Sequence, residues 1–173
     1  MNIRNHEFKA SVENLESYEK KLLTLNPIFH GIDLQKDTYF NAKKGRLKLR
    51  EGNIENSLIN YQREDIKGSK ESTVVLYKHS PDKALKDILE LQLGVLTIVE
   101  KKRKIYFIDT VKFHFDQVEG LGFFIEVEAI DDCEKFTSEE LKEQCDRYYH
   151  FFELDDFQLI DKSYSDLIVE LSK

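Results

Sequence analysis

Cysteine and long apolar runs are scarce in this 173-residue sequence, and their scarcity excludes several classes of protein. The two cysteines, Cys133 and Cys145, are too few for a disulfide framework and lack the spacing of a zinc finger. Reduced thiols are therefore expected, as in a cytoplasmic protein. No run approaches the roughly 18 consecutive apolar residues of a membrane helix, and the first residues contain no apolar signal-peptide core. We expect a cytoplasmic chain without a membrane partner.

An excess of positive charge is also missing. The formal net charge is −7 at pH 7, whereas a nucleic-acid-binding domain usually carries a basic patch and a high pI. We therefore expect no nucleic-acid partner and only a local anion site. The phosphate-binding motif G-x-x-x-x-G-K-[ST] is absent, and Gly120-Leu121-Gly122 lacks the third glycine of a dinucleotide-binding loop. With 40% hydrophobic and 34% charged residues, the composition is that of a folded protein, and the length fits one domain over residues 1–173.

Hydrophobic periodicity predicts an α+β fold with about eight strands and three or four helices. Alternating side chains place strands at 3–10, 35–40, 45–50, 57–64, 71–77, 96–107, 110–117 and 122–130. Helices are predicted from an N-cap at Ser11 to the break at Asn26-Pro27, from Ser80-Pro81 to a stop at Gly94, from Thr137 or Ser138 onward, and over 166–171. The segments 41–45 and 119–122 are expected to be hairpin loops.

The segment 45–50 carries the clearest charge pattern. In an extended strand, Arg46, Lys48 and Arg50 lie on one face, and Leu47 and Leu49 lie on the other. Taken alone, this pattern is typical of a solvated edge strand, where Lys and Arg discourage aggregation. The same sorting recurs, however, around residues 5–9, 112–116 and 124–128. Its recurrence favours a closed barrel whose interior is ionic.

If these charged faces converge, cations and carboxylates meet in one channel. Cations match a polyphosphate, and carboxylates match a hard divalent ion, Mg²⁺ or Mn²⁺. The cations on these faces are Lys9, Arg46, Lys48, Arg50, Arg63, Lys101 and Arg103, and the carboxylates are Glu7, Asp116, Glu126 and Glu128. His114 shares a face with Asp116, as any two residues two apart in a strand do. We interpret His114 as a wall residue or a phosphate contact rather than as a catalytic base.

A series of short patterns runs in order along nearly the whole chain. They are Asn5-x-Glu7-x-Lys9, Gln35-x-Asp37-x-Tyr39-Phe40, Arg46-Leu47-Lys48-Leu49-Arg50, Glu100-Lys101-Lys102-Arg103 followed by Ile105-Tyr106-Phe107, Asp116-x-Val118-x-Gly120-Leu121-Gly122, Phe124-Ile125-Glu126-Val127-Glu128 and Ser163-Tyr164-Ser165-Asp166-Leu167. Together they resemble the CYTH family, which groups class IV adenylate cyclases with thiamine triphosphatases and inorganic triphosphatases. The short length and the segment 97–131 are most similar to the class IV cyclase branch.

The resemblance implies an eight-stranded antiparallel closed barrel, or triphosphate tunnel, with flanking helices, a divalent metal and a triphosphate-bearing substrate inside. The implied metal ligands are Glu7, Glu126 and Glu128, with Asn5 and Asp116 as further candidates. The implied phosphate-binding residues are Lys9, Arg46, Lys48, Arg50, Arg63, Lys101 and Arg103, and among them the catalytic candidates are Lys9, Arg46, Arg50 and Arg103. Asn5 replaces the first Glu of the family's Glu-x-Glu-x-Lys signature. Because an amide oxygen ligates a metal without charge, metal affinity is expected to fall.

Three functions follow from this resemblance. The leading one is conversion of ATP to cyclic AMP and pyrophosphate, in which the 3′-hydroxyl attacks the α-phosphorus. The alternative is a triphosphatase that hydrolyses inorganic or organic triphosphates, and the second alternative is a non-catalytic protein that binds nucleotide or polyphosphate. No residue stands out as a general base. The abundance of Phe and Tyr is compatible with a homodimer.

Overall fold

Eight strands and four helices make up the described part of the chain, which covers residues 2–63, 68 and 70–172 of the computed structural model. The strands are β1 (Asn2–Val12), β2 (Ile28–Phe40), β3 (Arg46–Glu51), β4 (Ser57–Arg63), β5 (Lys70–Lys78), β6 (Val95–Ile108), β7 (Val111–Val118) and β8 (Gly122–Asp131). The helices are α1 (Glu16–Leu23), α2 (Lys83–Leu93), α3 (Ser138–Phe151) and α4 (Tyr164–Leu171).

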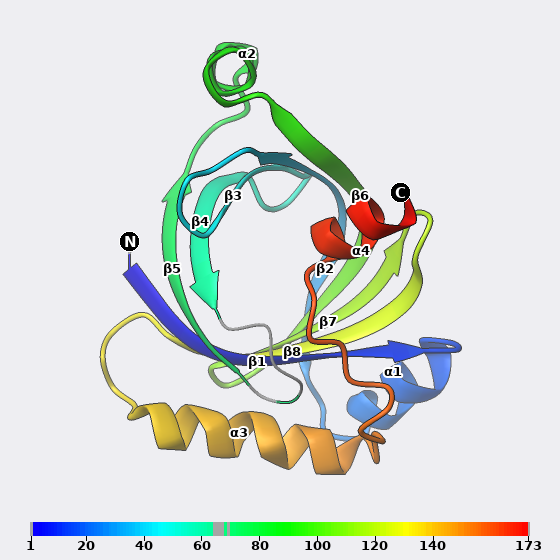
Figure 1. Cartoon of the computed structure of the whole chain (residues 1–173). Helices are drawn as coiled ribbons and strands as arrows, with labels where there is room; N and C mark the ends of the chain where they lie inside the picture. The colour runs from blue at the N-terminus through cyan, green and yellow to red at the C-terminus, as the bar shows by residue number, and fades with distance from the viewer. Residues whose placement is uncertain (1, 64–67, 69, 173) are drawn as a thin grey trace.

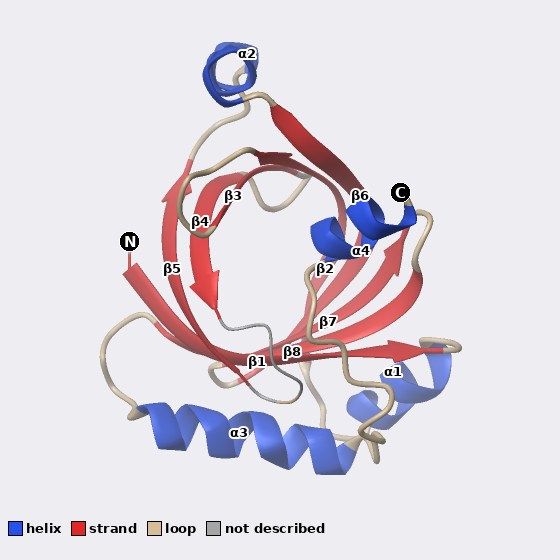
Figure 2. Ribbon diagram, in the orientation of Figure 1, coloured by secondary structure: helices blue, strands red, loops and turns tan. Residues whose placement is uncertain are grey.

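The strands close into a barrel in the order β1-β5-β4-β3-β2-β6-β7-β8, and every neighbouring pair is antiparallel (Figure 1). Figure 2 shows the strands around a central space, with α3 and α1 outside one side of the wall. The predicted α+β fold with a closed eight-stranded antiparallel barrel is therefore confirmed.

The largest apolar cluster lies between the outer face of this barrel and α3. On β1, Phe8 and Ala10 face outward and are almost fully buried, because α3 packs across β1 and β8. The outward residues of β7 and β8 join them, and α3 contributes Leu141, Cys145 and Tyr148. Since alternate residues of a strand face opposite sides, burying the apolar parity outside leaves the charged parity inside.

The first helix begins later than the sequence predicts. Ser11 is not its N-cap, because β1 continues through Val12 and Ser11 pairs with Phe124 of β8. The turn that follows is closed by Asn14, whose Oδ1 accepts a hydrogen bond from the backbone N–H of Ser17 at 3.2 Å. The pairing with β8 outweighs the local preference of Ser for a helix cap.

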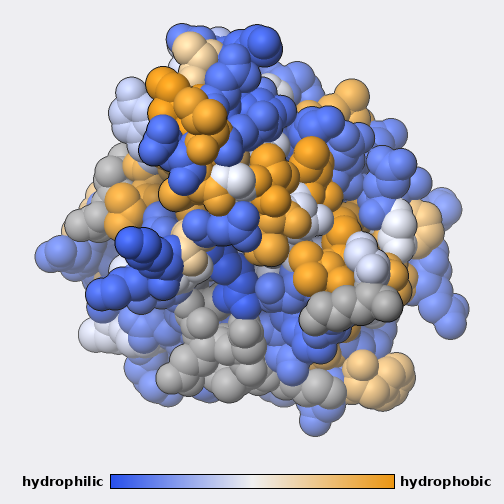
Figure 3. Space-filling model, turned by 45° about the horizontal axis from the view of Figure 1, so that its top comes forward, coloured by the Kyte–Doolittle hydropathy of each residue, from blue (hydrophilic) through white to orange (hydrophobic). Residues whose placement is uncertain are grey.

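The second helix also begins later than predicted, although its end is as expected. Asp82, not Ser80, is the N-cap, and its carboxylate accepts the backbone N–H of Ala84 at 2.8 Å. Gly94 ends the helix at a φ of +69°. None of the residues of α2 is buried, and Ile88 and Leu91 are 59% and 82% exposed. Figure 3 shows apolar residues gathered on the face of the molecule that carries α2.

The second strand is longer than predicted, since β2 begins at Ile28 rather than near residue 35. Its first half pairs with β6 through a register irregularity between Phe29 and Gly31. Ile32 and Leu34 are exposed there, whereas Asp33 and Gln35 are buried. The alternation is therefore the reverse of the pattern of a half-buried strand, whose apolar face is the covered one.

The last helix lies against the lumen of the barrel (Figure 1). Ser163 caps α4 in a capping box with Asp166. Tyr164 donates a hydrogen bond from its hydroxyl to Asp116 Oδ2 at 2.7 Å, and its ring packs on Phe124 inside the barrel. None of the four described helices has the length and hydrophobicity that a membrane span requires.

Candidate functional site

A cavity of about 770 Å³ lies inside the barrel and is lined by both charged and apolar side chains. The implied site residues that line it are Asn5, Glu7, Lys9, Lys48, Arg50, Lys101, Arg103, Glu126 and Glu128. Arg46 and Asp116 are not among its lining residues, and the side chain of Arg63 lies outside the described part of the chain. Residues distant in the sequence are thus gathered around one space.

Asp37 on β2 is the shared partner of three cations of this cavity. Its carboxylate accepts hydrogen bonds from Arg50 Nε at 2.8 Å and Arg50 Nη2 at 2.9 Å, and from Lys101 Nζ at 2.7 Å. Lys48 Nζ lies 3.3 Å from Asp37 Oδ2. Burial alone would raise the pKa of Asp37, but Arg50, Lys101 and Lys48 hold it well below its usual range. An ionised Asp37 therefore keeps the three cations together without a ligand.

Arg103 is the centre of a second ion-pair network, on β6, β7 and β8. Its Nε donates to Asp116 Oδ1 at 2.7 Å, and its Nη2 donates to Glu126 Oε2 at 2.7 Å. Lys9 Nζ lies 3.1 Å from the other oxygen of Glu126. Burial would raise the pKa of Glu126, yet Lys9 and Arg103 hold it well below its usual range. Asp116, which also accepts the hydroxyl of Tyr164, is placed as a counter-ion of Arg103.

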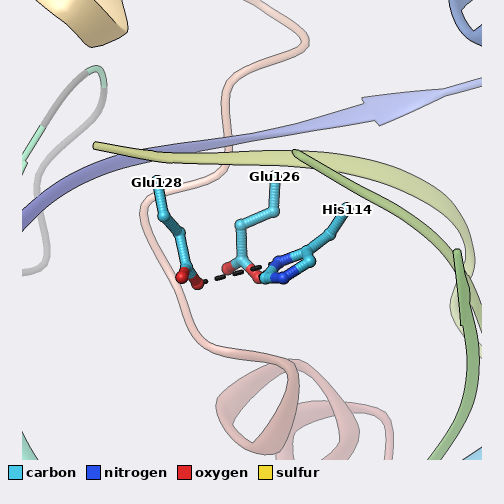
Figure 4. Close-up of side chains that lie close together, drawn as sticks. All are labelled: His114, Glu126 and Glu128. Carbon is cyan, nitrogen blue, oxygen red and sulfur yellow. Dashed lines mark hydrogen bonds and ion pairs between the residues drawn. The ribbon is translucent and has the colours of Figure 1, made fainter. Parts of the chain in front are cut away.

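Glu126, Glu128 and His114 form a cluster of candidate metal ligands (Figure 4). One ligand atom from each lies within 4.8 Å of the others. His114 Nδ1 is 3.2 Å from Glu126 Oε2 and 3.7 Å from Glu128 Oε1. Burial, and after it the charge of Arg103, lowers the pKa of His114, which favours the neutral imidazole that binds metals.

The donor atoms of this region fit a divalent cation. Two carboxylates and an imidazole converge, and carboxylate oxygen and imidazole nitrogen are common ligands of divalent ions. Asn5 Oδ1 is buried and has no hydrogen-bond partner within the described residues, as expected of an oxygen reserved for a ligand. Glu7 lines the same cavity opposite Glu128 in the β1–β8 register, but it stands outside the cluster.

Arg46, an implied phosphate-binding residue, lies toward α4. Its Nη2 is 2.8 Å from Asp166 Oδ2, and its guanidinium lies 5.9 Å from the ring of Tyr61. Burial would raise the pKa of Asp166, but hydrogen bonds from Ser163 and Arg46 lower it. Arg46 is therefore fixed between the barrel wall and the last helix.

Sequence reasoning missed Glu55, which lies in the loop between β3 and β4 and also lines the cavity. Its carboxylate accepts Arg50 Nη1 at 2.9 Å and forms an ion pair with Lys112 Nζ. The loop is held inward by Asp33, which accepts the backbone N–H of Ile54 at 2.8 Å and that of Glu55 at 3.0 Å. A loop carries no periodicity, so no signal marked Glu55. Lys112 shared the charged parity of β7 and could have been singled out on that ground.

The β4–β5 side of the cavity is mostly apolar, in contrast to the charged side, although Ser57, Ser72 and Lys78 also line it. Ile59, Val74 and Leu76 line it together with the rings of Tyr39 and Tyr61. Burial raises the pKa of both tyrosines, so their hydroxyls stay protonated. One space thus combines cations, carboxylates and an apolar wall, which suits an organic molecule that carries a polyphosphate.

The sequence model of the CYTH domain matches residues 4–158. None of the curated proteins compared with the chain matches it. Among solved structures, the PH1012 protein from Pyrococcus horikoshii is 26% identical, with a TM-score of 0.76 over 96% of this chain and 99% of its own.

Two further solved structures share the fold at lower identity. A candidate adenylate cyclase from Vibrio parahaemolyticus is 17% identical, with a TM-score of 0.74 over 95% of this chain and 97% of its own. A candidate adenylyl cyclase from Hippeastrum, reported to have a dominant triphosphatase activity, is 13% identical, with a TM-score of 0.61 over 99% of this chain and 96% of its own. The match to the domain model extends over most of the sequence. The chain therefore belongs to the CYTH domain family.

Proposed function

We propose that this protein is a divalent-metal-dependent enzyme that converts ATP to cyclic AMP and pyrophosphate inside the barrel. The observation that carries the proposal is the combination of three kinds of wall in one cavity. Cations match the triphosphate, the cluster of His114, Glu126 and Glu128 matches a metal, and the apolar β4–β5 side matches a nucleoside. A bare inorganic triphosphate would leave the apolar side without a partner.

The chemistry of such a step depends on positioning and on neutralising charge. The 3′-oxygen bonds to the α-phosphorus while the bond from that phosphorus to the bridging oxygen breaks, and pyrophosphate leaves with the negative charge. Arg50, Lys48 and Lys101, held together by Asp37, would stabilise the departing pyrophosphate. The proton of the hydroxyl passes to solvent in this scheme, since no side chain is assigned as its acceptor.

We propose that the remaining residues implied by the family resemblance bind phosphate or metal. Lys9 and Arg103 would contact phosphate and act in catalysis together with Arg50 and Arg46, and Arg63 would extend the phosphate site. Glu126 and Glu128 would hold Mg²⁺ or Mn²⁺, with Glu7, Asn5 and Asp116 as further oxygen donors. When bound, the metal would neutralise phosphate charge and polarise phosphate oxygens.

A triphosphatase is the second candidate, because the same walls serve if water replaces the 3′-hydroxyl. The side chain of Glu128 is 18% exposed, so solvent reaches the carboxylate end of the cavity. The dominant triphosphatase activity of the Hippeastrum protein, which shares the fold, agrees with this reading.

A product assay separates the candidates. The protein is incubated with ATP and Mg²⁺ or Mn²⁺, and in parallel with other organic triphosphates and with inorganic triphosphate. Cyclic AMP with pyrophosphate supports the cyclase, and orthophosphate supports the triphosphatase. No product with any metal, together with a raised melting temperature in ATP, indicates a binding protein and contradicts both.

A variant pair ties any activity to the cavity. Arg50→Gln removes a cation of the proposed phosphate site, and we expect kcat to fall about 100-fold or more, as when a charge-stabilising donor is lost. Lys44→Gln makes the same kind of change in the exposed β2–β3 turn and should leave kcat unaltered. Equal rates in both variants would place the reaction elsewhere.

A further inference from the structure

His114 is a buried imidazole inside the barrel that the ion-pair networks do not require. It is 1% exposed and faces Glu126 directly in the β7–β8 register. Glu126 already has an ion pair on each oxygen, with Arg103 at 2.7 Å and with Lys9 at 3.1 Å. A third donor to that carboxylate adds little, so a purely structural role does not account for a polar ring at this position.

The second nitrogen of the ring points to the same conclusion. His114 Nε2 is buried and has no hydrogen-bond partner among the described residues, and Asn5 Oδ1 of the same cavity is in the same condition. Most buried polar atoms are paired, because leaving one unpaired is unfavourable. The unpaired oxygen of Asn5 is an acceptor that a bound species in this cavity would satisfy, and the unpaired Nε2 shows that the ring is not held by a hydrogen bond to any described residue on its far side.

The geometry of the cluster identifies that species as a cation. His114 Nδ1 lies close to two carboxylates, 3.2 Å from Glu126 Oε2 and 3.7 Å from Glu128 Oε1, and Figure 4 shows the ends of the three side chains gathered together. A metal ion among these three atoms would take the lone pair of Nδ1, and the ring proton would then reside on Nε2. An anion would be repelled by both carboxylates.

We propose that His114 is a nitrogen ligand of the metal held by Glu126 and Glu128, and that it makes this site prefer a first-row transition metal to Mg²⁺. Magnesium favours a shell of hard oxygen ligands in strict octahedral geometry, whereas imidazole nitrogen binds transition metals well. Asn5 also lowers the preference for Mg²⁺, because it offers a neutral oxygen where the signature Glu-x-Glu-x-Lys has a charged one. The inference rests on the proposed function only in that the function calls for a divalent cation.

The test uses metal alone, with Mn²⁺ as the spectroscopic probe. Metal-free protein is titrated with Mn²⁺ while the EPR signal of the free ion is followed, and Mg²⁺ affinity is obtained by competition. In the wild type we expect tighter binding of Mn²⁺ than of Mg²⁺. In His114→Gln, Mn²⁺ affinity should fall about tenfold or more while Mg²⁺ affinity changes little, as expected when a nitrogen ligand is lost.

The control variant, His150→Gln on the exposed face of α3, should bind both ions as the wild type does. An unchanged Mn²⁺ to Mg²⁺ preference in His114→Gln overturns the proposal.

Pulsed EPR gives a readout that does not depend on the variant being folded. Wild-type protein loaded with Mn²⁺ should show electron spin echo modulation from ¹⁴N, and labelling histidine with ¹⁵N should replace that pattern. Modulation without any nitrogen contribution overturns the proposal. The outcome is separate from that of the product assay: nitrogen ligation without product would contradict the enzymatic function alone, and turnover with Mg²⁺ but no nitrogen ligation would contradict this inference alone.

Discussion

Lys101 has an unusual charge environment for a lysine. Its side chain is buried, its Nζ lies 2.7 Å from Asp37, and Arg50 and Arg103 are nearby. Burial, opposed by Asp37 and reinforced by the two arginines, lowers the pKa of Lys101 to about 7. Near neutral pH the ammonium is therefore close to losing its proton, unlike an exposed lysine.

A bound polyphosphate should reverse this shift. Its negative charge stabilises the ammonium form, so the pKa of Lys101 rises and, at pH 8, binding takes up close to one proton per ligand, about the most a single group can contribute. The uptake is measured by calorimetry of a non-reactive ATP analogue in buffers of different ionisation enthalpy. Lys101→Met should abolish it, and Lys102→Met, the exposed neighbour on β6, should retain it. Proton uptake that survives in Lys101→Met would contradict the role given to this group.

At the level of residues, strand parity identified most of the charged lining but not the partners within it. Alternation alone puts Lys48, Arg50 and Lys101 on inward faces, because the outward parity is apolar or solvated. That the three meet at Asp37 depends on the register of β2 with β3 and β6, which a single sequence does not encode in a readable form. The sequence likewise did not reveal that His114 lies close to Glu126 and Glu128, because those distances depend on the closure of the barrel.

Among the connecting elements, the loop 52–56 contributes most to the cavity. Asp33 fixes it by accepting two backbone N–H groups, and a Cβ on Gly52 would lie 2.6 Å from Asp33 Oδ1. The side chain that this brings inside, Glu55, neutralises Arg50 and Lys112. Burial would raise the pKa of Glu55, but Lys112 and Arg50 lower it strongly. The carboxylate of Glu55 thus neutralises part of the positive charge that a bound phosphate would otherwise contact.

Removing that internal anion should strengthen triphosphate binding. In Glu55→Gln, Arg50 and Lys112 lose a negative partner, so Kd for an ATP analogue should fall about tenfold, equivalent to roughly 1.4 kcal/mol. The free energy of unfolding without ligand should fall by about 1–3 kcal/mol, because the buried Arg50 and the partly buried Lys112 each lose a charged partner. Binding is measured by calorimetry and stability by urea denaturation.

Glu51→Gln is the control and should leave Kd unchanged, because the ion pair of Glu51 with Lys86 lies on the outer face of β3. An unaltered Kd in Glu55→Gln would mean that the loop does not compete with the ligand.

The start of α3 carries a local signal and was predicted, whereas the starts of α1 and β2 are set by strand pairing and were not. Thr137 begins α3 because its side chain and that of Glu140 satisfy each other's backbone N–H groups, a signal contained within four residues. The first half of β2 has no such local signal, and it is a strand because β6 pairs with it. Ser11 fails as a cap for the same reason, since β8 is its partner.

On the scale of the whole molecule, the barrel is stabilised from outside and charged inside. The apolar cluster under α3 supplies hydrophobic stabilisation, whereas one side of the interior carries ion pairs whose members are largely inaccessible to water. Removing the charge of one member of such a pair leaves the other buried and unpaired, which is strongly unfavourable. The stability of the fold is therefore expected to depend on the ionisation of its interior acids.

Acid should unfold this protein steeply, and the direction follows from the pKa values. Those of Asp37, Glu55 and Glu126 are all lowered in the folded state, so the unfolded chain binds more protons once the pH falls below about 4, the ordinary value for Asp and Glu. The stabilisation is complete above that pH and is lost progressively below it. Three such groups give a loss of about 4 kcal/mol per pH unit, enough to exhaust an ordinary stability of about 5–15 kcal/mol within a few pH units.

Urea denaturation between pH 6 and pH 2 measures this slope. Asp37→Asn should be less stable than the wild type at pH 6 but should show a slope smaller by about 1.4 kcal/mol per pH unit, because one of the three groups is gone. Equal slopes in the two proteins would show that Asp37 does not stay ionised in the folded barrel. They would then contradict the proposal that this carboxylate holds the phosphate-binding cations together.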